Sequence, residues 1–124
     1  MEQNAEYQIS SSINGTILEI TLTGAETQNT YRKIQNEIAD IIIKSRLRKV
    51  LMDCRDLKER LGITETYERV RSYPPEIYKV RFALVDLTEN SGYQNFHETT
   101  AINAGMQFKW FTDADDAKTW LMGK

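Results

Sequence analysis

The sequence has little cysteine and proline, and it lacks a long hydrophobic run. Its 124 residues include one cysteine, two prolines and six glycines. The single cysteine, Cys54, excludes an internal disulfide and a zinc site built from several cysteines. The longest strictly apolar run is residues 82–85, so no segment is long enough to span a bilayer as a helix. The chain also starts with polar and acidic residues, unlike a signal peptide, and we therefore expect a cytoplasmic protein without membrane insertion.

Charge is unevenly distributed in a chain whose net charge is −2. Residues 44–81 contain eleven Lys or Arg and six Asp or Glu, which gives this stretch a charge of +5. Such a stretch either contacts an anionic partner or forms solvated helix faces, because acidic residues are interleaved with the basic ones. The negative overall charge argues against nucleic-acid binding. With 40% hydrophobic and 27% charged residues, the composition predicts a single globular domain over residues 1–124.

The beginning of the chain has a pattern typical of a β-hairpin. Hydrophobic and polar residues alternate in 6–13 and again in 16–23, and Asn14-Gly15 lies between the two stretches. Asn-Gly favours a type I′ turn because both central positions of that turn need a positive φ. With this pair as a two-residue turn, Tyr7 would lie opposite Leu22 and the apolar sides of both strands would coincide.

Downstream of the hairpin, helical and extended patterns alternate. Apolar residues at offsets of three and four predict helices, and short apolar runs closed by a carboxylate predict buried parallel strands. Thr23 and Glu26 have the spacing of a capping box, which predicts the start of the first helix. After the hairpin the expected elements are a helix from Thr23 to about 44, a strand at 49–53, a helix at 64–73, a strand at 81–86, a helix at 94–104, a strand at 107–111 and a helix at 112–122. The sequence therefore predicts an α/β fold, with a mixed, mainly parallel five-stranded sheet, about four helices and an opening antiparallel hairpin.

Two segments carry a resemblance to a known fold. They are Val50-Leu-Met-Asp-Cys-Arg55 in the strand after the long helix, and the tail from Asn103 to Leu121, which has a glycine, a strand, an acidic turn and an Ala-x-x-Trp-Leu helix. With the element order of nearly the whole chain, they resemble the SpoIIAA-like fold, which houses STAS domains (sulfate transporters and anti-sigma-factor antagonists) and small bacterial proteins. The resemblance implies a regulatory or protein-interaction module.

The same order of elements is also similar to a reduced CRAL-TRIO lipid-carrier domain. This second resemblance implies an alternative function, a carrier that holds a lipid or another small apolar ligand in a pocket between helix and sheet. A ligand that copurifies with the protein would favour the carrier, whereas a stoichiometric protein complex would favour the module.

One segment departs from the pattern of the anti-sigma-factor antagonists. Those proteins carry an Asp-Ser-Ser-Gly-like stretch, with the phosphorylated serine, at the start of the second helix. Leu61-Gly62-Ile63-Thr64 occupies the corresponding place here, and Ile63 falls on the serine position. Thr64 and Thr66 are the nearest hydroxyls, and Thr64 is expected to cap the helix. The resemblance therefore implies a STAS-like module without the usual phosphorylatable serine.

The sequence shows no catalytic constellation. His97 is the only histidine that could serve Cys54 as a base, and no motif connects the two. A buried structural cysteine and a packed or surface histidine are the commoner cases. The carboxylates that close the strands match no phosphatase or response-regulator pattern, and glycine-rich phosphate loops are absent. We therefore expect no enzymatic activity, no cofactor and no metal site.

The expected binding site lies where the central strands end and the second helix begins. Carboxyl ends of parallel strands leave a crevice, and a helix N-terminus offers free N–H groups to an anion. Arg55 supplies a cation, unless it only pairs with Asp56 or Glu59 in solvent. The candidate residues are Arg55, Asp56, Gly62, Thr64, Thr66, Asp86 and Thr88. The expected occupant is a protein partner, a second copy of the chain or a small apolar ligand.

A second candidate surface lies between Tyr67 and Arg81. Three tyrosines flank Pro74-Pro75 in this stretch, and arginine and lysine are interleaved with them. Tyrosine and arginine suit an interaction surface. Tyrosines that cover the sheet while the basic side chains face water would give the same pattern.

Overall fold

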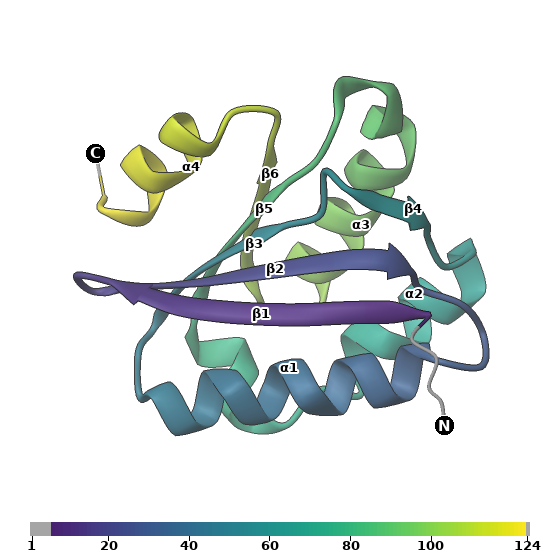
Figure 1. The fold of residues 1–124 in the computed structure, drawn as a ribbon, viewed down its shortest axis with the longest axis horizontal. Helices are drawn as coiled ribbons and strands as arrows, with labels where there is room; N and C mark the ends of the chain where they lie inside the picture. The colour runs from purple at the N-terminus through teal and green to yellow at the C-terminus, as the bar shows by residue number, and fades with distance from the viewer. Residues whose placement is uncertain (1–5, 124) are drawn as a thin grey trace.

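A six-stranded mixed sheet organises the protein, whose computed structural model describes residues 6–123 (Figure 1). In chain order the elements are β1 (Tyr7–Asn14), β2 (Ile17–Ala25), α1 (Tyr31–Ser45), β3 (Lys49–Asp53), β4 (Leu57–Glu59), α2 (Ile63–Arg71), the short 3-10 helix η1 (Pro75–Lys79), β5 (Arg81–Val85), the 3-10 turn η2 (Thr88–Asn90), α3 (Ser91–Asn103), β6 (Gln107–Phe111) and α4 (Ala114–Leu121). The predicted α/β class, the four α-helices and their order are confirmed.

The strands lie in the order β1-β2-β3-β5-β6, with the short β4 paired to the end of β2. The β1–β2 pair is antiparallel and the other pairs are parallel, as predicted. The sheet has six strands, one more than predicted, because the prediction did not include β4. β4 has only three residues, which is too short for an alternating pattern to be visible in the sequence.

The hairpin forms as predicted, but its register differs by two residues. Asn14 pairs with Ile17, so Gly15 and Thr16 form the turn, and Gly15 has the positive φ (65°). Tyr7 consequently lies opposite Gly24 rather than Leu22. Because side chains alternate with a period of two along a strand, this shift leaves every side chain on its predicted face.

The first helix begins later than the sequence suggested. Thr23 continues strand β2 instead of capping a helix, and α1 starts at Tyr31, after a turn in which the Thr27 backbone N–H donates to the Thr30 hydroxyl at 2.9 Å. Glu26 is therefore outside the helix, and its side chain is buried. The predicted capping box is wrong because Thr23 lies within β2, whose end pairs with both β1 and β4.

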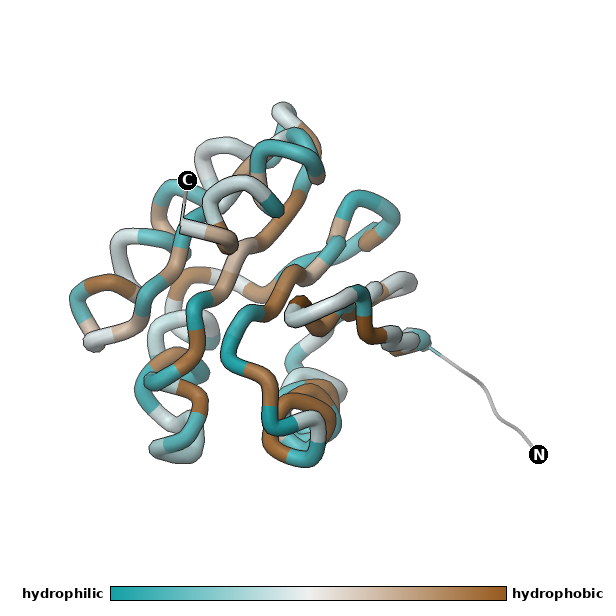
Figure 2. Tube along the Cα trace, turned by 90° about the vertical axis from the view of Figure 1, so that its left-hand side faces the viewer, coloured by the Kyte–Doolittle hydropathy of each residue, from teal (hydrophilic) through white to brown (hydrophobic). Residues whose placement is uncertain are grey.

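The core has two parts, one on each face of the sheet. On the larger side α1, α2, α3 and η1 pack on residues such as Ile20, Val50 and Phe82. On the other side α4 alone packs, through Ala117 and Leu121, on the opposite faces of the strands. In Figure 2 hydrophobic residues recur along the strands and alternate with hydrophilic ones around the helices. The larger side leaves room for an internal site, which is described below.

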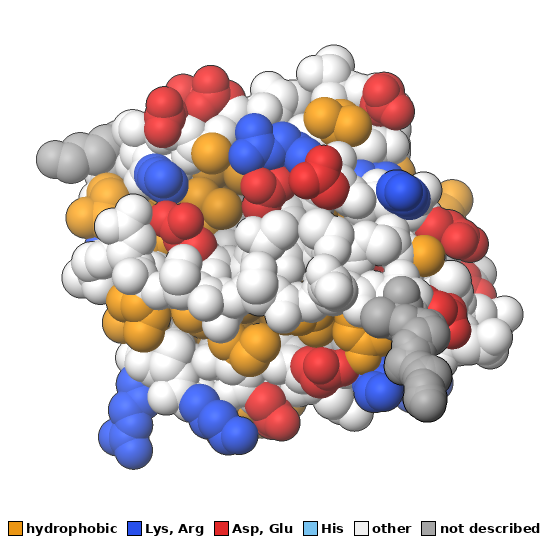
Figure 3. All heavy atoms as spheres, in the orientation of Figure 1, with side chains coloured by type: hydrophobic (Ala, Val, Ile, Leu, Met, Phe, Trp, Pro, Cys, Tyr) orange, Lys and Arg blue, Asp and Glu red, His pale blue; other side chains and the backbone are white. Residues whose placement is uncertain are grey.

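Strand β1 forms one edge of the sheet and carries mostly uncharged polar side chains. Gln8 and the three serines at 10–12 are exposed. Figure 3 shows them as a pale band across the middle of the molecule, with hydrophobic side chains below it. No residue of β1, Tyr7–Asn14, is charged.

Candidate functional site

The carboxyl ends of β3 and β5 meet at one edge of the sheet because the two strands pair in parallel. Five of the seven predicted site residues are exposed near these ends and along the start of α2, and two are inside the protein. The exposed ones are Arg55, Asp56, Gly62, Thr64 and Thr88, and the fully buried ones are Thr66 and Asp86. Only the exposed residues can contact a partner directly, so the buried two can act only by holding others in place.

Arg55 pairs with Asp53 rather than with Asp56 or Glu59. Its Nε and Nη2 atoms donate to the two carboxylate oxygens of Asp53 at 3.0 and 2.9 Å, and its backbone N–H donates there too. Partial burial raises the pKa of Asp53, but the hydrogen bonds from Arg55 outweigh it and hold that pKa below its usual range. The Arg55 side chain is 42% exposed, so the pair contributes under about 1 kcal/mol.

Asp86 is the centre of a buried hydrogen-bond network behind this edge. Its carboxylate accepts from Arg60 at 2.6 and 2.9 Å, from Gln94 at 2.8 Å and from Asn90 at 3.1 Å. The backbone N–H of Leu87 donates to it as well, at 2.7 Å. Arg60 also donates to the Cys54 carbonyl at 3.0 Å. The network thus ties the segment after β3 to the segment after β5 and to α3.

The start of α2 is built differently from the prediction. Gly62, not Thr64, is the N-cap residue, and no side chain caps this helix end. The predicted cap is wrong because the helix begins at Ile63, which places Thr64 within the first turn. Thr66 faces inward, and its hydroxyl lies 2.7 Å from the hydroxyl of Tyr93 on α3. Thr66 therefore joins α2 to α3 instead of facing a partner.

The outer side of α2 exposes hydrophobic surface. Ile63 is 64% exposed and Tyr67, four residues later, is 48% exposed. Arg71 follows after another four residues, and its guanidinium lies 4.6 Å from the centre of the Tyr67 ring. Residues four apart share one helix face. We call Ile63, Tyr67 and Arg71 the α2 stripe.

A shallow groove lies beside this edge of the sheet. It runs between the end of β2, the segment around β4 and the residue that follows Asp86. Its lining residues are Thr23, Gly24, Arg55, Asp56, Leu57, Lys58 and Leu87. Leu87 is 40% exposed, so a hydrophobic side chain lies beside the charged ones in this groove. Two of the predicted site residues, Arg55 and Asp56, thus belong to one concave surface.

The alternative surface between Tyr67 and Arg81 is divided in the structure. Tyr73 and Tyr78 pack partly buried against the core, with their rings 6.3 Å apart. Arg69 is buried, and the Arg81 guanidinium lies over the Trp120 ring of α4 at 3.9 Å. Tyrosines that cover the core are therefore part of the explanation of this sequence pattern.

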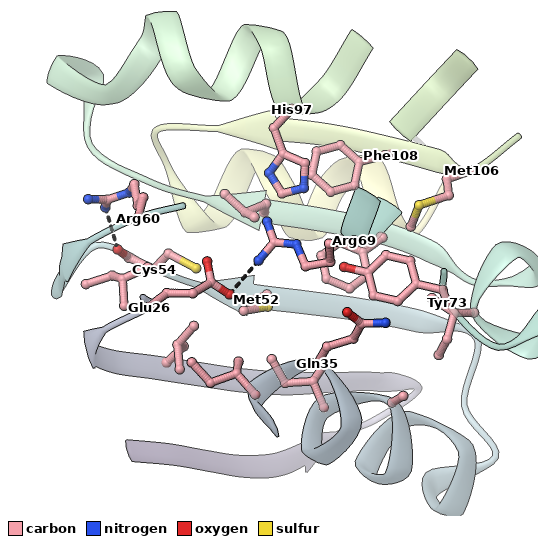
Figure 4. A pocket seen from close by; sticks show the side chains of 18 of the residues that line it. Glu26, Gln35, Met52, Cys54, Arg60, Arg69, Tyr73, His97, Met106 and Phe108 are labelled. Atoms are coloured by element: carbon pink, nitrogen blue, oxygen red, sulfur yellow. Dashed lines mark hydrogen bonds and ion pairs between the residues drawn. The ribbon is translucent and has the colours of Figure 1, made fainter. Parts of the chain in front are cut away.

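An internal cavity lies on the larger side of the sheet, under α1, α2 and α3 (Figure 4). Its volume is about 40 Å³, and most of its wall is hydrophobic. Its apolar lining includes Leu22, Ile34, Met52, Leu84, Met106 and Phe108, and its polar lining includes Glu26, Gln35, Arg69, Tyr73, Tyr93, Gln94 and His97. A mostly hydrophobic cavity with a few polar groups is the usual form of a small-molecule site.

A buried ion pair crosses this cavity between Glu26 and Arg69. The two side chains are 5% and 8% exposed. Burial alone would lower the pKa of Arg69, but the carboxylate of Glu26 more than compensates and raises it. The Arg69 Nε atom has no hydrogen-bond partner, which is rare for a buried donor. Arg69 therefore lines the cavity with a buried Nε–H that has no acceptor among the described residues.

His97 and Cys54 are buried near this ion pair, in forms unsuited to catalysis. Burial, with the charge of Arg69, lowers the pKa of His97 well below its usual value, so the ring is neutral. Its Nδ1 lies 3.3 Å from Gln94 Oε1, and its ring lies 4.7 Å from that of Phe108. Burial raises the pKa of the Cys54 thiol, which disfavours the reactive thiolate. The expected burial of Cys54 is confirmed, and of the two places expected for His97, packed or on the surface, the structure shows the packed one.

The free energy of unfolding is expected to decrease as the pH is lowered from about 7 to about 5.5, because of His97. The unfolded chain takes up a proton near pH 6.5, whereas the buried ring stays neutral to a much lower pH. The unfolded state therefore binds more protons in this window, and the unfolding free energy decreases by up to about 1.4 kcal/mol per pH unit.

Urea unfolding at both pH values measures this decrease. The chain has a single histidine, so His97→Gln removes the effect at its source. An equal pH dependence in the parent protein and in His97→Gln would show that another group is responsible.

Within residues 6–123, no three His, Cys, Asp or Glu side chains gather in a group that could hold a metal ion. In the same part of the chain, no helix is both long and apolar enough to cross a membrane.

The sequence analysis missed the residues that shape the cavity and the buried network. Arg69, Val70 and Tyr73 recur with Thr66 at helical spacing, a signal that would have placed Arg69 on the inner face of α2. No sequence pattern indicated that Glu26 is buried, because a carboxylate between two elements is normally exposed. Arg60 was equally inconspicuous in a stretch of alternating charges.

Comparisons with known proteins support the fold. No protein-family model matches the sequence, and no curated protein does either. Several solved structures are similar to this chain, and two of them match over nearly its whole length. An anti-sigma factor antagonist from Mycobacterium paratuberculosis shares 13% identity, with a TM-score of 0.65 and 94% of each chain covered. An uncharacterized protein from the DUF3478 family with a SpoIIAA-like fold, from Shewanella loihica PV-4, shares 16% identity, with a TM-score of 0.61 and 98% of each chain covered. The predicted SpoIIAA-like fold is confirmed.

Proposed function

We propose that this protein is a non-enzymatic protein-interaction module of the STAS-like kind, which binds its partner through the α2 stripe and the exposed edge beside it. The partner is a second protein with a hydrophobic groove for Ile63 and Tyr67. One of the similar structures is an anti-sigma factor antagonist, a protein named for its action on another protein.

The α2 stripe is the observation that carries this proposal. Large exposed hydrophobic side chains elsewhere in the described residues stand singly on their elements, which is normal for a soluble protein. Ile63 and Tyr67 share one helix face, and Ile63 is the most exposed of them all. Tyrosine and arginine are enriched among the residues that dominate interface energetics, and Tyr67 and Arg71 are stacked on this face.

The residues of the edge support the same surface. Arg55 and Asp56 line the groove, and Thr64 lies in the first turn of α2. Asp86 holds the segments on both sides of this edge, so the surface is rigid before a partner arrives, which lowers the cost of binding. We propose that Ile63 takes the position that the phosphorylated serine has in STAS domains of the anti-sigma-factor antagonists, and that binding here is not controlled by phosphorylation at that position.

The cavity supports the module over a lipid carrier. Its volume of about 40 Å³ holds roughly three water molecules, far less than a lipid chain needs. The buried Glu26–Arg69 pair also crosses the space that an apolar chain would occupy.

Affinity capture with matched variants tests this proposal. The tagged protein, Ile63→Glu and Ile102→Glu are each exposed to a lysate of the source cells, and retained proteins are quantified by mass spectrometry. Ile102 is 52% exposed on α3, so Ile102→Glu matches the chemical change at a distant surface. We expect one other protein to be retained in stoichiometric amount by the parent and by Ile102→Glu, and at least about tenfold less by Ile63→Glu.

Two companion variants test the edge. Arg55→Ala and Thr64→Ala should weaken capture, whereas Lys118→Ala on α4 should not. If Ile63→Glu retains the same proteins in the same amounts as the parent, or if the parent retains none in stoichiometric amount, the proposal is wrong.

A further inference from the structure

The internal cavity offers a hydrogen-bond donor that nothing in the described chain uses. Arg69 Nε is buried and without a partner, although the Nη1 atom of the same side chain pairs with Glu26. Native proteins rarely leave a buried donor unpaired, because the desolvated N–H then makes no hydrogen bond at all. The side chain lies on the inner face of α2 and lines the cavity (Figure 4). The cavity and the unpaired Nε–H are therefore two independent observations on the same region of the protein.

The wall of the cavity selects for hydrophobic surface on the ligand. Side chains from β2, α1, β3, β5 and β6 supply it, among them Leu22, Ile34, Met52 and Phe108. Two methionines, Met52 and Met106, add flexible side chains that adapt to different shapes. Gln35, Tyr73 and Tyr93 are only half-buried, and they mark the side on which the cavity approaches solvent. A ligand of a few heavy atoms fits, and a longer one would extend between these three side chains.

The charges around the cavity select for a neutral ligand. Glu26 balances Arg69, and Arg60 is balanced by Asp86. His97 is neutral, since its pKa lies well below the usual value through burial and the charge of Arg69. A carboxylate ligand would therefore leave one net negative charge in a hydrophobic interior, and an ammonium ligand one positive charge. A neutral acceptor, such as a ketone, ester or ether oxygen, satisfies the Nε–H without that cost.

We propose that this cavity binds a small neutral amphipathic molecule, whose oxygen accepts a hydrogen bond from Arg69 Nε–H while its apolar part packs on the hydrophobic wall. This site is separate from the α2 stripe, because Arg69 is on the inner face of the helix and the stripe is on the outer face. The cavity can therefore bind its ligand whether or not a protein binds to the α2 stripe.

A set of three matched probes tests the proposal on the intact protein. Pentan-2-one is neutral and has a single acceptor oxygen, valerate is a carboxylate of similar size, and pentylamine is a cation. Two-dimensional ¹H–¹⁵N NMR follows the Arg69 Nε–H signal during each titration. We expect pentan-2-one to shift this signal saturably, with a dissociation constant on the order of 1 mM, and valerate and pentylamine to bind at least about tenfold more weakly.

Three variants locate the binding. Ala39→Leu fills the cavity from α1 and leaves the ion pair intact, so it should weaken pentan-2-one binding at least about tenfold. Arg69→Lys keeps the positive charge but has no Nε–H, and it should weaken binding of the ketone as well. Ala114→Leu makes the same change as Ala39→Leu on α4, across the sheet, and should bind like the parent.

The results that would overturn the proposal are equally specific. They are the absence of a saturable shift with pentan-2-one, tighter binding of valerate or pentylamine than of the ketone, and unchanged affinity in Ala39→Leu. If Arg69→Lys does not fold, the parent titration and Ala39→Leu decide the question without it.

Discussion

Replacing Arg69 with methionine is expected to lower the unfolding free energy by about 3–5 kcal/mol, because it leaves the Glu26 carboxylate buried without a counter-charge. Both side chains are more than nine-tenths buried, so water cannot replace the missing partner. The Glu26→Leu change should cost a similar amount, since it leaves the arginine charge unpaired. Urea unfolding measures both costs.

The double variant Glu26→Leu, Arg69→Met measures how strongly the two buried charges depend on each other. Apolar residues of similar volume often replace a buried ion pair at little cost, so we expect the double variant to recover most of the lost stability. The double variant should therefore lose much less unfolding free energy than the sum of the losses of the two single variants. Additive losses would mean that the two charges do not depend on each other and that the structural assignment of the pair is wrong.

Asp86→Ala should be the second strongly destabilising change, again by about 3–5 kcal/mol. It removes the acceptor shared by Arg60, Asn90, Gln94 and the Leu87 backbone, and it leaves the arginine charge largely buried. The loss should also be local, because the network joins the segments after β3 and β5. Amide hydrogen exchange should accelerate in residues 54–62 and 87–94 before the rest of the sheet opens.

Asp53→Ala is the matched control for this prediction. Asp53 also accepts two side-chain hydrogen bonds from an arginine, but that pair is partly exposed to solvent and its loss should cost under about 1 kcal/mol. Equal costs for Asp53→Ala and Asp86→Ala would show that the buried network does not stabilise the edge.

The parts of the fold that local patterns determine were predictable. Strands β3 and β6 have their predicted bounds, because a run of hydrophobic residues or a strict alternation fixes them locally. The third helix was expected to end at 104, and Gly105, which follows it, has a φ of 98°, the left-handed conformation that glycine favours after a helix. The Thr23–Glu26 spacing misled because β4, distant in sequence, pairs with the end of β2 and keeps it extended.

The site was less predictable because its geometry depends on distant pairs of charged residues. Glu26 and Arg69 are separated by 43 residues, and Arg60 and Asp86 by 26, so no local pattern connects them. The sequence analysis expected Asp86 at a binding surface because it follows the end of a strand. In the structure Asp86 is buried, and Gln94 on α3 donates a hydrogen bond to it. Burial of a charged group follows from its partner, which a single sequence does not reveal.

Hydrogen exchange of the protein alone and with the partner that it retains tests the central claim most directly. If the α2 stripe and the neighbouring edge form the interface, binding should slow exchange in residues 54–71 and leave α4 and β1 unchanged. Slower exchange confined to α4 or to the β1 edge, with residues 54–71 unaffected, would contradict the account.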